Sequence, residues 1–224
     1  MIINLYFRGF EGGCKLFSKK EYIVVVCRDC FVFYNKDNGL KESVSFSIQH
    51  IPNVPFYHYL FEEETEKFIR DIQTKVSIKK SALYILIPDD ALGIDIKVLQ
   101  EFFIQLGCRK IIFSKQNILL SNCVEDYISI SFTSRVVAIS YVKSGGAESI
   151  DFFAYNEFDV KNISYIIKNL HNDCVYSDLK IYVNSIGISN NYEDIGKIVQ
   201  VDDIVNNFKK LYIEKTHKDR IVSI

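Results

Sequence analysis

The most constraining feature of this sequence is a β-rich stretch that occurs twice. Tyr127–Tyr155 reads YISISFTSRVVAISYVKSGGAESIDFFAY, and Tyr22–Ile48 reads YIVVVCRDCFVFYNKDNGLKESVSFSI. Both are rich in Ile, Val, Phe and Tyr, which favour strands, and both contain the Gly-bearing sequences of tight hairpin turns. Aligning Tyr22 with Tyr127 gives an offset of 105 residues (127 − 22 = 105). The pattern predicts two three-stranded meanders, and hence two copies of one unit.

Helix and strand patterns follow each meander. The first meander has expected strands at 22–27, 30–35 and 43–49, and residues 2–7 before it either add an edge strand or fray. After it we expect a helix at 58–74, a buried strand at 82–87, a helix from Asp95 to Leu106 ended by Gly107, a strand at 110–114 and a link at 116–121. After the second we expect a helix at 160–170, strands at 179–184 and 198–201, and a helix at 202–214. This order predicts an α/β fold.

The composition of the chain argues against several classes of function and location. The 224 residues are 48% hydrophobic and 25% charged, with a net charge of −1, so electrostatics give no reason to expect nucleic acid as a partner. No apolar run approaches the roughly 18 residues of a membrane span, so no membrane insertion is expected. The first ten residues lack the features of a signal peptide, and the six cysteines lack a secreted disulfide pattern. These observations predict a cytoplasmic protein.

One long segment resembles a known superfamily. Ala82–Ser114, ALYILIPDDALGIDIKVLQEFFIQLGCRKIIFS, has a strand that ends in Pro, then a helix, then Gly, one residue, a basic residue and a strand. Lys115–Asn122 is similar in place to a short helical link, and Tyr127–Tyr141 to the hairpin that opens a second lobe. Together they resemble the actin and heat-shock-chaperone ATPase superfamily. The resemblance implies two ribonuclease-H-like lobes, at residues 1–121 and 122–224.

The sequence departs from this superfamily where ATP would bind. The resemblance implies ATP between the lobes, held by Gly-rich hairpin turns and by an Asp from the first strand of each lobe. Here the turns read Val26-Cys-Arg-Asp-Cys30 and Ser131-Phe-Thr-Ser-Arg135, without glycine and without an Asp at the strand end. The adenosine-side Gly-Gly is reduced to Ser185-Ile-Gly187. Bulky side chains would block the close approach of backbone to phosphate, so we expect no catalytic residues and no cofactor.

Three functions remain open. The first is a non-catalytic scaffold, similar to the cytoplasmic actin-like components of pilus and secretion machines, which binds other proteins and self-associates. The second is an ATP-binding or ATP-hydrolysing protein with divergent phosphate loops. Its expected site residues are Asp29, Thr133, Ser134 and Gly187, with ATP and Mg²⁺ as ligands. The third is a nuclease, which needs clustered carboxylates that the central strands lack.

Cys27 and Cys30 form a C-x-x-C pair in the first turn. A thioredoxin-type site needs the first Cys at a helix N-terminus, whereas FVFY, a strand sequence, follows here. A zinc site at Cys27 and Cys30 would need a second pair of ligands, and the remaining cysteines are scattered. The favoured interpretation is therefore a hairpin turn with two partly buried thiols, with zinc as the alternative.

Other polar and aromatic residues each have a structural and a functional interpretation. Asp89 and Asp90 follow a buried strand, where α/β proteins place functional groups, but turn chemistry and helix entry explain them equally well. His50 and His58 could bind a metal or act as an acid–base pair, or they could be ordinary surface residues. The aromatic residues beside the Pro-rich break could contact a protein partner or fill the core: Phe56, Tyr57 and Tyr59.

Overall fold

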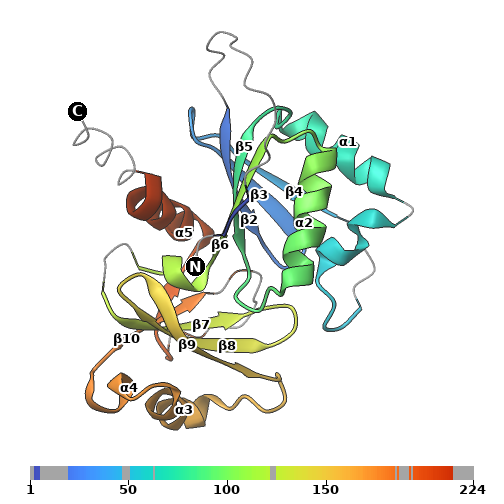
Figure 1. Cartoon of the computed structure of the whole chain (residues 1–224). Helices are drawn as coiled ribbons and strands as arrows, with labels where there is room; N and C mark the ends of the chain where they lie inside the picture. Colours follow the sequence, from blue (N-terminus) through green and yellow to red (C-terminus); the bar gives the residue numbers. More distant parts are fainter. Residues whose placement is uncertain are drawn as a thin grey trace, which may run out of the picture. The chain divides into compact units, whose positions relative to one another are not determined.

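The computed structural model describes residues 3–5, 20–46, 51–62, 64–121, 125–184, 186, 192 and 194–213. The chain divides into two compact units (Figure 1). Residues 2–87 and 91–114 form what we call the N-terminal unit, and residues 88–90 and 115–224 form the C-terminal unit. Each unit contains one mixed sheet with flanking helices, which confirms the predicted α/β class.

The sheet of the N-terminal unit has the strand order β1-β6-β5-β2-β3-β4. Its strands are β1 (Ile3–Leu5), β2 (Glu21–Val26), β3 (Cys30–Asn35), β4 (Lys41–Ser45), β5 (Ala82–Ile87) and β6 (Lys110–Lys115). The strands β2, β3 and β4 pair antiparallel in chain order, so the first meander is confirmed. The strand β5 runs parallel to β2, and β1 lies antiparallel to β6 at the edge.

The helical segments of this unit are η1 (Phe56–Phe61, a 3₁₀ helix), α1 (Thr65–Lys75) and α2 (Gly93–Gln105). The single helix predicted at 58–74 is wrong in its extent, because Glu62 has an extended backbone (φ −85°, ψ −166°) that separates η1 from α1. The helix α2 begins two residues before Asp95, whose carboxylate accepts a hydrogen bond from the Leu92 N–H at 2.7 Å. Gly107, with φ +83°, follows the end of α2 as predicted.

Aromatic side chains fill the core of the N-terminal unit. Phe31 of β3 is fully buried, and its ring lies 5.0 Å from the ring of Phe56 and 5.3 Å from that of Phe103. Phe56 and Tyr57 are each 1% exposed, so the interpretation of these two residues as a protein-contact surface is wrong. Pro55 directly precedes η1, and the burial of the large apolar side chains of Phe56 and Tyr57 stabilises the fold. Tyr59 is partly exposed.

The sheet of the C-terminal unit has the order β11-β10-β7-β8-β9. Its strands are β7 (Tyr127–Phe132), β8 (Val137–Lys143), β9 (Gly146–Phe153), β10 (Lys180–Asn184) and β11 (Lys197–Val199). The second meander, β7-β8-β9, is confirmed. Its β8–β9 turn has positive φ at Ser144 (52°) and Gly145 (78°), one residue earlier than the Gly-Gly pair that the sequence suggested.

In the structure, the two meanders are separated by an offset one residue larger than the 105 residues of the sequence alignment. The β2–β3 turn is closed by Cys27 and Cys30, and the β7–β8 turn by Thr133 and Val136, so the offset is 106 (133 − 27 = 106). The tyrosines used in the alignment lie at different positions of their strands. In the correct register, Asp29 corresponds to Arg135.

The helical segments of the C-terminal unit are η2 (Asn117–Leu119), η3 (Val160–Asn162), α3 (Ile163–Leu170), α4 (Asp173–Tyr176), α5 (Val201–Phe208) and the π-helical η4 (Lys209–Ile213). The short helix α4 was not predicted. In Figure 1, α3 and α4 lie on one face of this sheet. Ile166 and Ile167 of α3 pack against that face, which carries Ile128 and Ile130. Alternation along β7 places Ser129 and Ser131 on the opposite face, where both are buried.

Candidate functional site

The first hairpin turn contains two residues, Arg28 and Asp29, between Cys27 and Cys30. The Cys27 N–H donates a hydrogen bond to the Cys30 carbonyl oxygen at 3.0 Å. Arg28 and Asp29 are exposed and have negative φ, so the turn lacks the left-handed backbone that glycine provides in Gly-rich loops. Cys27 is 9% exposed and Cys30 is half-buried. Asp29 therefore presents its carboxylate to solvent at the tip of this turn.

The second turn is closed by the backbone and the side chain of Thr133. The Thr133 N–H donates to the Val136 carbonyl oxygen at 3.0 Å. The Thr133 hydroxyl oxygen accepts from the N–H groups of Arg135 and Val136, at 3.2 and 3.1 Å. Three backbone N–H groups of this turn are thus satisfied within it. Tyr155 also donates its hydroxyl hydrogen to the Thr133 carbonyl oxygen, so the turn is held from a second side.

Arg135 and Asp90 form an ion pair beside this turn. Nε of Arg135 lies 2.7 Å from Oδ2 of Asp90, and one terminal nitrogen lies 2.8 Å from the Asp90 carbonyl oxygen. The side chain of Arg135 is 19% exposed and that of Asp90 is 6% exposed. Asp90 therefore follows a buried strand, where a functional group was one of the two interpretations of this residue. Its carboxylate, however, forms an ion pair with an arginine of the same chain.

Asp89 is buried in a polar network of the C-terminal unit. Its Oδ1 accepts from the Asn117 N–H at 2.7 Å, and Asn117 Nδ2 donates to the Ser140 hydroxyl at 2.9 Å. Burial raises the pKa of Asp89 to about 6, against the smaller opposing effects of Ser131, Asn117 and Lys115. Oδ2 of Asp89 has no hydrogen bond of normal geometry among the described residues. This network lies on the polar face of the second sheet.

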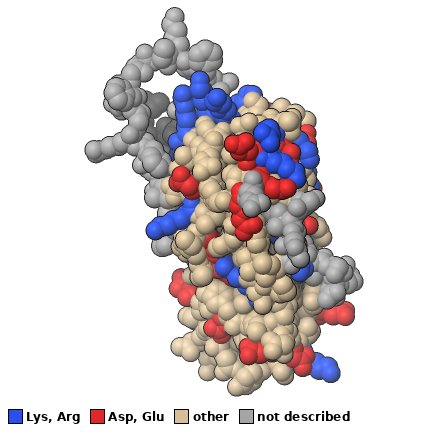
Figure 2. Space-filling view, turned by 90° about the vertical axis from the view of Figure 1, so that its right-hand side faces the viewer, with Lys and Arg blue, Asp and Glu red and all other residues tan. Residues whose placement is uncertain are grey.

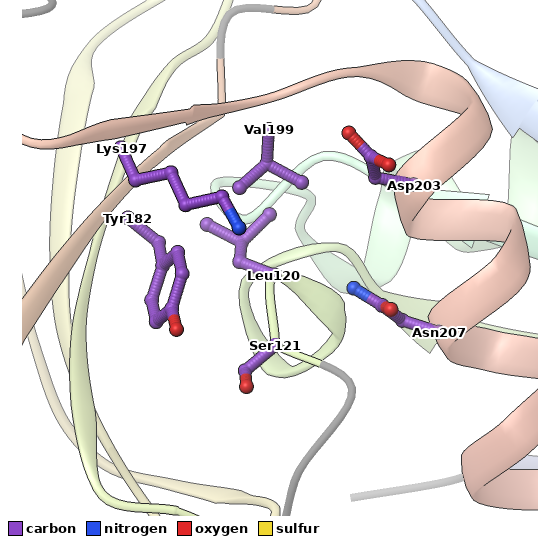
Figure 3. Close-up of a pocket in the computed structure, with 7 residues that line it drawn as sticks. All are labelled: Leu120, Ser121, Tyr182, Lys197, Val199, Asp203 and Asn207. Carbon is purple, nitrogen blue, oxygen red and sulfur yellow. The ribbon is translucent and has the colours of Figure 1, made fainter.

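The same unit contains a small pocket of about 100 Å³, partly open to solvent (Figure 3). It is lined by Leu120, Ser121, Tyr182, Lys197, Val199, Asp203 and Asn207. The Ser121 and Tyr182 hydroxyls both donate to Glu125, at 2.6 and 2.7 Å, and Asn207 donates to the Leu119 carbonyl oxygen at 2.9 Å. None of the predicted site residues lines this pocket. Its polar groups therefore serve mainly to connect neighbouring segments.

His58 and Asp95 form a further pair in the N-terminal unit. Nε2 of His58 lies 2.5 Å from Oδ1 of Asp95, whose side chain is fully buried, whereas that of His58 is 29% exposed. His58 therefore satisfies a buried carboxylate at the start of α2, and His50 lies outside the described residues.

Two predicted site residues remain. Ser134 lies at the tip of the second turn, and Gly187 lies outside the described residues. Among the described residues, no group of three or more His, Cys, Asp or Glu side chains is arranged to hold a metal ion. Sequence reasoning missed Arg135, although its place in the second turn was the available signal.

Two surface properties bear on possible partners. On the face shown in Figure 2, Lys and Arg side chains lie among Asp and Glu side chains, and large areas carry neither. No helix in the described part of the chain is both long enough and apolar enough to cross a membrane.

Comparison with known proteins shows likeness in structure. No protein-family model and no curated protein sequence matches the chain. The AlfA filament bound to AMPPNP is similar over 89% of this chain and 98% of its own, with a TM-score of 0.52 and 9% identity. The ethanolamine utilization protein EutJ from Carboxydothermus hydrogenoformans is similar over 82% of this chain and 85% of its own, with a TM-score of 0.51 and 10% identity.

A lower likeness concerns MreB5 of Spiroplasma citri bound to ADP. The match covers 67% of this chain but only 55% of that chain, with a TM-score of 0.45 and 8% identity. The two likenesses above a TM-score of 0.5 agree with the two mixed sheets and their flanking helices. This chain has the actin-like α/β fold.

Proposed function

We propose that this protein is a non-catalytic actin-like scaffold that binds other proteins and whose phosphate-binding turns no longer bind nucleotide. The observation that carries the proposal is the use of backbone N–H groups in the second turn. Phosphate binding in hairpin turns depends on N–H groups that point outward and have no internal partner. In this turn the N–H groups of Thr133, Arg135 and Val136 all have partners within the turn.

The side chains around this turn support the same conclusion. The Asp90 carboxylate, which is 6% exposed, accepts the Arg135 guanidinium, so this arginine is already engaged as a cation. A phosphate at the turn would have to break the ion pair and leave Asp90 buried without its partner. The first turn adds a similar obstacle, because Cys27 uses its N–H within the hairpin.

Exposed apolar side chains support protein partners. Six of the eleven large hydrophobic residues that are exposed among the described residues fall between Phe152 and Tyr176. Tyr176 is 92% exposed and Tyr165 is 74% exposed. The AlfA neighbour forms a filament, which favours a second copy of this chain as one such partner.

Calorimetric titration with Mg²⁺-ATP and Mg²⁺-ADP tests the nucleotide part of the proposal. We expect no heat of binding at millimolar nucleotide. Thr133→Ala serves as the comparison, since it removes the hydroxyl that occupies the N–H groups of Arg135 and Val136. Micromolar binding by the wild-type chain would overturn the proposal.

The alternative is a nucleotide-binding protein with divergent loops. It is favoured by the solvent-exposed carboxylate of Asp29 in the first turn and by the AMPPNP bound to the AlfA neighbour. Under this alternative, Asp29→Ala lowers the affinity for Mg²⁺-ATP by about tenfold, equivalent to about 1.4 kcal/mol. Asp37→Ala, in the exposed β3–β4 turn, is the matched control and leaves the affinity unchanged.

Light scattering over a range of protein concentrations tests self-association. We expect the mass to rise with concentration in the wild-type chain and to stay at that of one chain in a Tyr165→Lys, Tyr176→Lys double variant. Leu40→Lys, at an exposed position in the N-terminal unit, is the control. A wild-type chain that stays monomeric throughout would remove self-association from the proposal.

A further inference from the structure

We propose that Cys27 and Cys30 form a reversible thiol–disulfide site that reacts with small disulfides of the glutathione class. This inference goes beyond the proposed scaffold function and does not depend on it. The two thiols lie in the same hairpin turn, and the residues are free cysteines.

Backbone geometry brings the two residues within disulfide range. The Cys27 N–H···O=C Cys30 hydrogen bond of 3.0 Å makes them a facing pair at the end of the β2–β3 hairpin. Facing residues of this kind have Cα atoms about 5.5 Å apart, within the roughly 4.4–6.8 Å that disulfides span. Facing residues also direct their side chains to the same side of a hairpin. The Cys27 thiol is buried and donates to the Val25 carbonyl oxygen at 3.9 Å.

The two cysteines differ in environment, as the two roles in disulfide exchange require. The neighbouring Cys27 thiol lowers the pKa of Cys30, against the opposing effect of burial and with a further contribution from Ser43, and Cys30 is half-buried. The neighbouring Cys30 and burial raise the pKa of Cys27 far above its usual value. Cys30 is therefore the better nucleophile and the more accessible one. Cys27 resolves the mixed disulfide because it faces Cys30 across the hairpin, and its raised pKa makes this second step the slower one.

The reaction has two balanced steps. The Cys30 thiolate attacks one sulfur of the small disulfide, so that a mixed disulfide forms and one small thiolate leaves. The Cys27 thiol then loses its proton and attacks the Cys30 sulfur, which forms the Cys27–Cys30 bond and releases the second small thiol. Two protein thiols are oxidised and one small disulfide is reduced to two thiols, without a metal or cofactor.

The other described cysteines provide internal controls. Burial raises the pKa of Cys108 to about 12, and burial also raises the pKa of Cys174. Both should react more slowly than Cys30, because the thiolate is the nucleophile. Cys14 and Cys123 lie outside the described residues, so each cysteine must be followed by its own peptide.

The test is equilibration of the full-length reduced protein in buffers of graded glutathione and glutathione disulfide, followed by alkylation and peptide mass spectrometry. We expect a Cys27–Cys30 peptide that has lost two hydrogen atoms and that returns to the dithiol form in excess reduced glutathione. Cys27→Ser should instead accumulate a glutathione adduct on Cys30, and Cys30→Ser should leave Cys27 unmodified. We expect Cys30 to react about tenfold faster than Cys108.

Two results would overturn the proposal. One is full alkylation of both cysteines in glutathione disulfide alone, and the other is cross-linking of either cysteine only to Cys14 or Cys123. Circular dichroism establishes that each variant is folded. Cys27→Ala replaces Cys27→Ser if the buried hydroxyl prevents folding, and it must trap the same adduct.

Discussion

The guanidinium of Arg135 donates to both the side chain and the main chain of Asp90, at 2.7 Å to Oδ2 and 2.8 Å to the carbonyl oxygen. The two residues are 45 positions apart in the sequence, and the pair fixes the second hairpin turn to the loop that follows β5. Because the Asp90 side chain is only 6% exposed, the arginine satisfies a carboxylate that water reaches poorly.

Loss of the Arg135–Asp90 pair should be costly. Arg135→Ala is expected to lower the free energy of unfolding by about 2–3 kcal/mol, since it leaves a buried carboxylate without its partner. Denaturant unfolding measures the change. Glu64→Gln breaks a Lys67–Glu64 pair whose side chains are about half exposed, and it should cost less than about 0.5 kcal/mol. Equal effects of the two substitutions would contradict the structural role given to Arg135.

The hydroxyl of Thr133 should stabilise its turn. Thr133→Ala removes the acceptor for the N–H groups of Arg135 and Val136, and we expect a loss of about 1 kcal/mol in denaturant unfolding. Thr133→Ser keeps the hydroxyl and should lose less than half as much. A serine variant as unstable as the alanine variant would show that the methyl group, not the hydrogen bonds, is responsible.

Asp89 should make stability depend on pH. Its pKa is about 6 in the folded chain instead of 3.8, so the folded state binds the proton more tightly than the unfolded state does. As the pH rises from about 4 to about 6, loss of this proton lowers the stability of the folded state. The destabilisation is absent below about pH 4 and complete above about pH 6, where it reaches about 3 kcal/mol. Asp89→Asn cannot ionise. Its stability relative to wild type should therefore rise by about this amount from pH 4 to pH 7, as measured by urea unfolding.

The opposite pH dependence is expected for Glu125. Lys180, Ser121 and Tyr182 bind its carboxylate and lower its pKa to about 2 from 4.5. Its stabilising effect is present above about pH 4.5 and is lost as the pH falls towards 2. Glu125→Gln should therefore be less stable than wild type at pH 6 and approach it near pH 2. A difference that stays constant with pH would exclude the ionised carboxylate as the cause.

The sequence by itself determined the repeated meanders, because β-branched and aromatic residues at strand positions and turn residues between them are local signals. It also determined β5 and the Gly107 stop of α2, since a short apolar run and a positive φ need no distant partner. The actin-like fold could be predicted from the order of these elements.

Only the tertiary structure decided which polar residues meet. Asp90 and Arg135 were both visible in the sequence, but their contact depends on how the β5 loop and the β7–β8 turn pack, which no local pattern encodes. The same holds for the buried Phe56 and Tyr57 and for the Asp89–Asn117 network. Local propensity acts over a few residues, whereas burial and hydrogen-bond partners are set by segments far apart in the chain.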